Sequence, residues 1–347
     1  MNKFKNLSIG KKIGIICGAI VVAFISLVLC LLLALHVVTP LASIDFFANS
    51  NPEYVTPGIF EGLVPQGYAY LSDKDVYIQC GYMSDGTSAS RIYVTSADDT
   101  SDSFFVELYT ADGQPYTGHT GGITSYEGLV WLANDGEGED NCVWMFTLEE
   151  LLNSKDGKVI LDTKFLPESR AACCFADGEY LWVGEFNDGE KYVTKETHAF
   201  GENNALVCAY AIDTASEYGI KFDVVEGKNI FTPVLALSVT DLVQGFTKTA
   251  DGFVLSTSYS VRASHLYFYP DVTKGAADAS ISINGKDVPV YSLDNEVMIK
   301  DVAMPPMSEG IFVKDGRVFV LFESACQKYI FGNFTHGIFT FSYKLPE

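Results

Sequence analysis

The hydrophobic and polar residues of this chain alternate in short runs that recur along most of its length. The clearest instance is Ser308–Ser324, which reads SEGIFVKDGRVFVLFES. Two runs with apolar residues at every second position flank the pair Asp315-Gly316. Asp-Gly between two such runs is the strongest short-range signal for a β-hairpin. The stretch therefore predicts a hairpin that opens with a Glu-Gly pair.

The same arrangement recurs at four more places, and further apolar runs follow each copy. Two copies open with Gln66-Gly67 and Gln244-Gly245, and two looser ones span Gly121–Leu132 and Ala171–Val183. The third runs are Arg91–Thr95, Cys142–Leu148, Ala205–Ile212, Ser264–Tyr269 and Gly337–Tyr343. Candidate fourth runs are Ser103–Tyr109, Lys158–Phe165, Gly219–Val225 and Ala279–Ile283 with Asp287–Tyr291.

Five repeats of up to four strands predict an all-β chain that folds as a five-bladed β-propeller. Each unit recurs after about 50 to 70 residues and needs neighbours to bury its faces, which is typical of propeller blades. A β-sandwich is the competing all-β fold, but it does not explain why each repeat restarts with the same hairpin. The fifth repeat lacks a fourth run, so we expect a strand within Glu53–Phe60 to close the ring and protect its edges.

A long apolar segment precedes the repeats and predicts a transmembrane signal-anchor helix. No charged residue occurs in 13–38, and this length exceeds the roughly 30 Å hydrocarbon core at about 1.5 Å per residue. A cleaved signal peptide and a buried helix are the alternatives. The division is then a basic tail at 1–12, the span at 13–38, a connector at 39–62 and the propeller at 63–347. The lysines that precede the span are Lys3, Lys5, Lys11 and Lys12.

Those lysines predict a single-pass protein of the cell membrane with a cytoplasmic N-terminus and an extracytoplasmic propeller at the cell surface. The partner of residues 13–38 is then the lipid bilayer. Asp and Glu number 44 against 23 Lys and Arg, and the net charge is −21. This charge repels phosphates, so nucleic acid is excluded as a partner, while divalent cations and basic ligands are favoured.

The eight cysteines are spread over the chain without a Cys-x-x-Cys pair. Two lie in the span, and six could form up to three disulfides outside the cytoplasm. Most of these six stand inside apolar runs, which favours buried free thiols. The sequence also contains no Gly-x-Ser-x-Gly, no Gly-x4-Gly-Lys and no His-Glu-x-x-His, so the common hydrolase, nucleotide and zinc-protease motifs are absent.

Candidate ligand-binding residues follow from strand direction in a propeller blade. Loops that enter the innermost strand and loops that join the second strand to the third lie at the same end of the ring, around the central channel. Loops on a rigid scaffold commonly carry function. Several of these polar residues could instead satisfy backbone groups near the axis. The candidates are Gln66, His119, Arg170, Gln244, Glu309, Tyr82, Asp135, Glu185, Tyr259 and Glu323.

Metal binding and acid-base chemistry each have one candidate feature. The acidic loop at 135–140 could hold calcium through several carboxylates, although it lacks EF-hand spacing and also suits a solvated hairpin tip. Paired carboxylates are available as Glu309 with Glu323, or as Glu185 with Asp188. Sequence alone does not set their separation, so no acid or base is assigned from it.

The blade openings resemble those of known propeller families. Gln66-Gly67, Gln244-Gly245 and Glu309-Gly310-Ile311 are similar to openings in glutaminyl cyclases of the plant and bacterial type. That resemblance implies five blades and a functional glutamate at Glu309. The chain also looks similar to the gluconolactonase and strictosidine-synthase-like group, which implies calcium in the channel, and to membrane-tethered propellers of Gram-positive bacteria.

Three functional hypotheses follow. The first is a membrane-anchored binding module for a small ligand, a peptide or a cell-envelope partner at the channel mouth. The second is an enzyme of cyclase or hydrolase type centred on Glu309, which would be the catalytic residue. The third is a subunit that docks on an envelope protein through its acidic surface. A second acid beside Glu309 would favour the enzyme, and a channel filled by glycines would argue against it.

Overall fold

The computed structural model describes residues 8–34, 39–154, 157–329 and 337–346. Helix α2 (Ile9–Leu33) has 25 residues, none of them buried, and its length and composition allow it to cross a membrane. It begins before the predicted span, so Lys11 and Lys12 lie in its first turn. Lys3, Lys5 and residues 35–38 lie outside the described residues.

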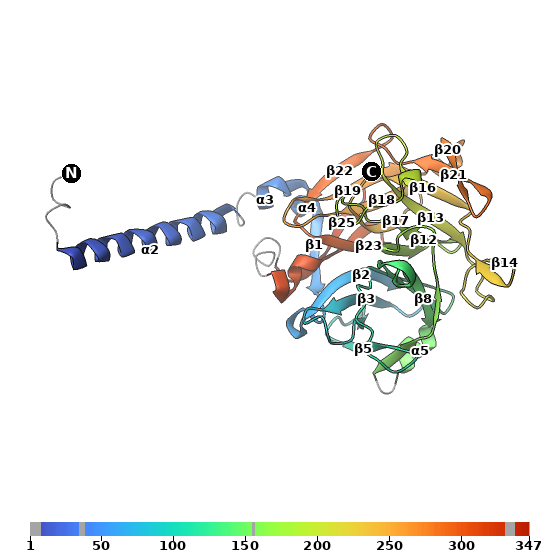
Figure 1. Ribbon diagram of the computed structural model, residues 1–347, viewed down its shortest axis with the longest axis horizontal. Helices are drawn as coiled ribbons and strands as arrows, with labels where there is room; N and C mark the ends of the chain where they lie inside the picture. Colours follow the sequence, from blue (N-terminus) through green and yellow to red (C-terminus); the bar gives the residue numbers. More distant parts are fainter. Residues whose placement is uncertain (1–7, 35–38, 155–156, 330–336, 347) are drawn as a thin grey trace.

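The strands of the remaining described chain form five blades of mainly antiparallel sheet and one separate two-stranded hairpin, which confirms the predicted five-bladed propeller (Figure 1). The first blade holds β2 (Leu63–Leu71), β3 (Val76–Met83), β4 (Arg91–Ser96) and β5 (Ser103–Thr110). The second holds β6 (Gly122–Tyr126), β7 (Leu129–Asn134), β8 (Cys142–Thr147) and β10 (Thr163–Phe165). The third is built on β11 (Cys173–Ala176), β12 (Tyr180–Gly184), β13 (Ala205–Ala211) and β16 (Leu235–Val239).

The last two blades complete the ring. The fourth holds β17 (Val243–Lys248), β18 (Gly252–Thr257), β19 (Ser264–Pro270) and β22 (Lys300–Met304). The fifth holds β23 (Ser308–Lys314), β24 (Arg317–Phe322), β25 (Phe339–Lys344) and β1 (Ser50–Val55). Short helices are α3 (Thr39–Ala42), α4 (Ile44–Asn49), α5 (Leu148–Asn153), η2 (Ile59–Glu61), η3 (Gly138–Asp140), η4 (Glu196–His198), η5 (Val272–Lys274), η6 (Glu323–Ala325) and η7 (Gln327–Tyr329).

Three predicted fourth strands were wrong. The run Lys158–Phe165 divides, because β9 (Lys158–Leu161) joins the first blade beside β5 and only β10 stays in the second. The run Gly219–Val225 contributes β14 (Asp223–Val225), which pairs with β15 (Lys228–Ile230) as a separate hairpin. The pair β20 (Ala279–Ile283) and β21 (Lys286–Ser292) extends the third blade, not the fourth. Alternation marks a strand but does not choose its partner.

The connector supplies the outer strand of the fifth blade. Strand β1 runs antiparallel to β25, with Pro52 opposite Phe341. It lies earlier than the expected Glu53–Phe60, since η2 occupies Ile59–Glu61. A proline is tolerated on such an outer strand, where its missing N–H leaves no ladder bond broken inside the sheet. The first and last strands of the propeller are thus hydrogen-bonded neighbours.

Glycines at the blade openings let the five innermost strands approach backbone to backbone. A Cβ atom on Gly67 would lie 2.6 Å from the amide nitrogen of Ile123, and one on Gly122 would lie 2.4 Å from that of Cys174. A Cβ on Gly310 would lie 2.5 Å from the amide nitrogen of Tyr68. A cavity of only ≈ 10 Å³ remains among these strands, about the space for one water. The recurring glycine therefore closes the channel.

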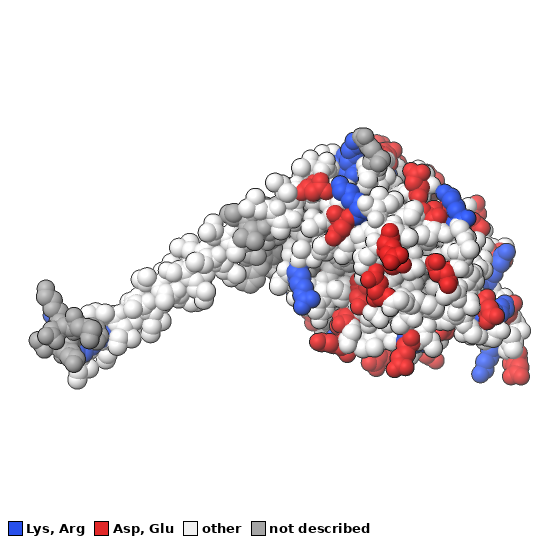
Figure 2. All heavy atoms as spheres, turned by 90° about the horizontal axis from the view of Figure 1, so that it is seen from above, with Lys and Arg blue, Asp and Glu red and all other residues white. Residues whose placement is uncertain are grey.

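The third blade meets the axis with Cys173-Cys174 in place of glycine. All eight cysteines lie in the described residues and all are free, and the six outside α2 are buried. Burial raises the pKa of both adjacent thiols, so neither is a ready thiolate. The surface around this core is acidic, and Figure 2 shows Asp and Glu side chains spread over the propeller.

Candidate functional site

A pocket of ≈ 610 Å³ lies above the closed part of the channel, at the mouth where the blade loops meet. Every blade contributes to its lining, and its volume is in the range of sites for small ligands. The lining residues share an aromatic or polar character, with few aliphatic side chains. They are Tyr82, His119, Asp135, Ala172, Phe186, Lys191, Tyr192, Gln244, Ser258, Tyr259, Ser260, Met307, Glu309, Glu323, Lys328 and Tyr329.

Seven of the ten residues singled out from the sequence line this pocket. They are Tyr82, His119, Asp135, Gln244, Tyr259, Glu309 and Glu323. The other three, Gln66, Arg170 and Glu185, do not line the pocket. They contact residues of the lining or hold the loops around it. The strand-direction argument therefore brought most of the candidates to one place, while their role in binding stays a prediction.

Two carboxyl groups from the fifth blade occupy the pocket together. Glu309 is the second residue of β23 and is 1% exposed, and its Oε2 has no hydrogen-bond partner in the described parts of the chain. Burial and the nearby charge of Glu323 raise the pKa of Glu309 well above its usual value. An isolated buried carboxylate is costly, so burial favours the protonated form of Glu309.

Glu323 begins the loop after β24 and is better supplied with partners. The Tyr82 hydroxyl donates to its Oε1 at 3.2 Å, and Lys328 Nζ donates to the Tyr82 hydroxyl at 2.7 Å. Burial raises the pKa of Glu323, while Lys328 and hydrogen bonds from Tyr82 and Gln66 act in the opposite direction. Gln66 thus supports the carboxyl pair from outside the pocket. Glu323 thus has hydrogen-bonding partners, whereas Glu309 Oε2 has none among the described residues.

His119 forms part of the aromatic wall. Its ring stacks on that of Tyr82, with centroids 5.1 Å apart and an interplanar angle of 26°. His119 is exposed, but desolvation by the surrounding pocket and the positive charges of Lys328 and Lys191 lower its pKa. The imidazole is therefore neutral at physiological pH and offers one donor and one acceptor to a ligand.

Asp135 is engaged by Arg170. The guanidinium contacts both carboxylate oxygens, at 2.6 Å to Oδ1 and 3.2 Å to Oδ2. This ion pair, with one hydrogen bond from Arg170 Nε to Oδ2, offsets the charge of the first acid of the loop at 135–140. Within residues 8–34, 39–154, 157–329 and 337–346, no group of three or more His, Cys, Asp or Glu could hold a metal ion. The predicted calcium site thus gains no support from this loop.

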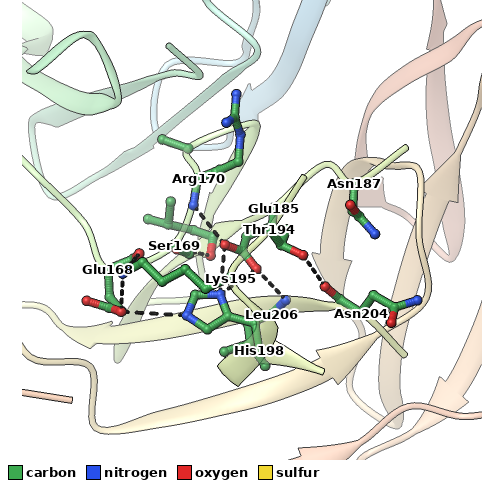
Figure 3. A network of polar contacts seen from close by, with 12 residues as sticks. Glu168, Ser169, Arg170, Glu185, Asn187, Thr194, Lys195, His198, Asn204 and Leu206 are labelled. Carbon is green, nitrogen blue, oxygen red and sulfur yellow. Dashed lines mark hydrogen bonds and ion pairs between the residues drawn. The ribbon is translucent and has the colours of Figure 1, made fainter. Parts of the chain in front are cut away.

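Glu185 belongs to a buried network beneath the pocket (Figure 3). His198 Nδ1 lies 2.9 Å from Glu185 Oε2, and the backbone amides of Leu206 and Arg170 donate to the same carboxylate at 2.9 and 3.1 Å. His198 Nε2 lies 3.6 Å from Oε1 of Glu168. Although burial acts to lower it, the nearby carboxylates of Glu168 and Glu185 raise the pKa of His198 to about 9. The imidazolium is the stable form.

This network holds the connection between β12 and β13, which forms one wall of the pocket. Phe186, Lys191 and Tyr192 of that connection line the pocket. Asp188 accepts bonds from the amides of Glu190, Lys191 and Tyr192, and Asn187 donates to Asp241 at 2.7 Å.

Sequence reasoning missed part of the pocket. The connection between β12 and β13 was expected at the channel mouth because it joins a second strand to a third. Nothing in the sequence indicated a role for His198. Lys328 and Tyr329 were also missed, because they follow the last residues of the fifth blade that were considered as candidates for the site. The missed lining residues are Ala172, Phe186, Lys191, Tyr192, Ser258, Ser260, Met307, Lys328 and Tyr329.

Comparison with known proteins returns structural likenesses only. No family model and no curated protein matches the sequence. Similar solved structures include the glutaminyl cyclase of Myxococcus xanthus, at 9% identity and a TM-score of 0.41 over 78% of this chain and 88% of that one. A putative oxidoreductase (glucose dehydrogenase) from Thermus thermophilus is 11% identical, with a TM-score of 0.43 over 84% of this chain and 98% of that one. BamB from Moraxella catarrhalis is 8% identical, with a TM-score of 0.35 over 82% of this chain and 84% of that one.

These likenesses include the glutaminyl cyclase type that the blade openings resemble. At such identities and TM-scores they carry no inference about activity.

Proposed function

We propose that this chain is a membrane-anchored, extracytoplasmic propeller that binds a small ligand in the pocket at the channel mouth. The observation that supports it best is Glu309, a buried carboxyl group that lines the pocket with Oε2 unpartnered among the described residues. A buried polar group without a partner destabilises the fold. Such a group at the base of an open pocket is explained when a ligand completes its hydrogen bonding.

The lining defines the kind of ligand. Tyr82, Tyr192, Tyr259 and Phe186 offer ring faces, which suit a flat or ring-shaped body. Glu323 and Lys328 supply opposite charges close together, and His119 is neutral. With its charges balanced in this way, the pocket favours a neutral or zwitterionic molecule rich in hydrogen-bonding groups. A saccharide unit or a short peptide end from the cell envelope has this chemistry.

The membrane anchor in this proposal is α2. Its 25 residues are apolar and unburied, and Lys11 and Lys12 near its start favour a cytoplasmic N-terminus. We expect alkaline carbonate to leave the full chain in the membrane fraction, and a protease added outside the cell to reach the propeller. Protection of the propeller in intact cells would overturn the topology.

The binding proposal is tested by thermal shift of the full chain in detergent. Three probes represent the ligand classes: chitotriose, D-alanyl-D-alanine and spermidine. We expect chitotriose or the dipeptide to raise Tm, and Tyr259→Ala to remove that shift. The matched control is Tyr218→Ala, which changes a tyrosine outside the pocket. A shift that survives Tyr259→Ala, or none with any probe, would contradict the proposal.

An enzyme is the second candidate, because Glu309 and Glu323 line the same pocket and burial raises the pKa of both. The glycine-filled channel beneath the pocket argues against it. One neutral acid beside one carboxylate is the arrangement that general acid-base catalysis uses. Strongly perturbed carboxyl groups in a pocket are also typical of active sites. In this reading Glu309 donates a proton to the leaving or accepting atom of the substrate, and Glu323 accepts one.

One variant distinguishes the binding hypothesis from the enzyme hypothesis. Glu309→Gln keeps the shape and a hydrogen-bond donor but removes the transferable proton. A pure binding site should keep its thermal shift in this variant. An enzyme should keep the shift and lose turnover of the same compound, followed by mass spectrometry.

A further inference from the structure

A set of exposed apolar side chains lies along one edge of the propeller. We name it the anchor edge and define it as Leu41, Ile44, Val55, Phe60 and Phe339, with exposed fractions of 61%, 63%, 40%, 62% and 38%. Val55 is paired directly with Phe339 across β1 and β25, and Phe60 lies in η2, which follows β1. The labelled elements α3, α4 and β1 lie at the side of the propeller nearest α2 (Figure 1).

The helices of the anchor edge are fixed to the propeller. Phe46 of α4 is fully buried, and its ring lies 5.7 to 5.9 Å from those of Phe322, Phe341 and Tyr343. Asp45 forms an ion pair with Lys300 at 3.0 Å. Burial of a phenylalanine side chain contributes on the order of 2 kcal/mol or more. The segment 43–50 therefore moves with the fifth blade and does not act as a free tether.

Few residues separate this segment from α2, and their number limits the distance between the anchor edge and the end of α2. Helix α2 ends at Leu33 and α3 begins at Thr39. Residues between them span at most about 3.6 Å each, which sets an upper limit of about 20 Å. If α2 spans the bilayer, a tether this short keeps α3 and α4 within reach of the lipid head groups.

The chemistry of the edge fits that environment. Leu41 of α3 and Ile44 of α4 are both exposed, and the one acid of this segment, Asp45, is paired with Lys300. Phe60 adds an apolar aromatic ring of the kind that interfacial segments bury at the boundary of the acyl chains.

The elements of the edge also carry Glu53, which contacts Ser342, and Glu61, which pairs with Arg91. Further acidic groups are spread over the propeller surface (Figure 2), which anionic lipids repel.

We propose that the anchor edge rests in the head-group region of the bilayer and fixes the orientation of the propeller on the membrane. This inference rests on the proposed membrane anchoring by α2. The occupant of the apolar edge is the lipid interface itself. Because Phe60 and Phe339 are distant from α2 in sequence, their contact with lipid would be a property of the folded propeller and not of the linker.

Quenching by brominated lipids tests the proposal with the full chain in liposomes. The native tryptophans, Trp131, Trp144 and Trp182, are buried and give a constant background. Ile44→Trp and Phe60→Trp each add an indole on the anchor edge. Val261→Trp is the matched control, because Val261 is 76% exposed on the loop between β18 and β19.

We expect brominated acyl chains to quench the added indoles of Ile44→Trp and Phe60→Trp, and to leave that of Val261→Trp unchanged. Quenching in Phe60→Trp no greater than in Val261→Trp would overturn the proposal, even if Ile44→Trp is quenched. Carbonate extraction of the same liposomes separates the two ideas. Release of the chain from the liposomes would contradict the anchoring proposal. Retention of the chain without quenching of the added indoles would contradict the anchor-edge proposal alone.

Discussion

His198 Nδ1 lies 2.9 Å from Oε2 of Glu185, and both side chains are buried beneath the mouth pocket. The same carboxylate accepts the backbone amides of Leu206 and Arg170. One ion pair therefore joins the connection after β12 to strand β13 and to the entry of the third blade. The pocket wall formed by Phe186, Lys191 and Tyr192 depends on this pair for its position.

The first prediction concerns His198→Gln and pH. Breaking a buried ion pair by removing one partner costs about 3–5 kcal/mol. The folded pKa of His198 is about 9 and its ordinary value is 6.5. Because the folded pKa is the higher one, the stabilisation is complete below about 6.5 and is lost as pH rises through about 9. The Tm deficit of the variant should be large at pH 6 and smaller at pH 10.

The charged groups around His198 are Glu168, Glu185 and Lys195. Comparing the variant with the wild type at each pH cancels the titration of the other groups. A deficit that stays constant from pH 6 to pH 10 would show that His198 acts by packing alone.

The second prediction is that Glu309→Gln stabilises the protein. Burial raises the pKa of Glu309, so its contribution to stability is present below the unfolded value of 4.5 and declines as pH rises towards the folded value. The neutral amide avoids this loss. We expect the Tm of the variant to exceed that of the wild type at pH 8, with a smaller gap at pH 4.5. A variant less stable than the wild type at pH 8 would contradict the assignment.

The third prediction concerns the glycines at the axis. A methyl group on Gly122 would meet the backbone of Cys174 at 2.4 Å, and backbone of a neighbouring blade cannot move aside cheaply. Gly122→Ala should destabilise the protein by about 3 kcal/mol. Gly275→Ala is the control, because the nearest atom there is 3.5 Å away. Equal losses of Tm in the two variants would show that the ring is less tightly packed than described.

The fourth prediction concerns the docked segment before β1. Phe46→Ala removes a fully buried ring and should cost about 3–5 kcal/mol. Phe60→Ala changes a ring that is 62% exposed and should alter the stability by no more than about 0.5 kcal/mol. Tm of both variants in detergent checks this. Phe46→Ala should also make the chain near α4 more sensitive to protease, and unchanged proteolysis would contradict the docking of α4.

Local signals in the sequence predicted the hairpins well. Asp315-Gly316 lies at the turn between β23 and β24, where both residues have positive φ, and the blade openings lie at the axis as expected. The outer strands were predicted less well. Lys158–Phe165 looks like one strand, yet its halves pair with different blades. Pairing at an outer edge depends on contacts between distant segments, which alternation does not encode.

The candidate site was predictable to the extent that strand direction determines it. Glu309 and Glu323 come from opposite ends of one hairpin, and the antiparallel pairing of β23 with β24 places both at the channel mouth. Glu185 was selected by the same rule but turned toward His198. The direction of a side chain in a long connection depends on partners such as Glu168 that the local sequence does not reveal.

The pairing of β1 with β25 has a consequence for how the protein is made. Pro52 leaves the ribosome long before its partner Phe341, so the seam between them cannot form until that partner has emerged. Until then the blades carry an open end on each side. Maturation of the ring is thus a late event, and a truncated product lacking its final strand would expose an edge that quality control can recognise.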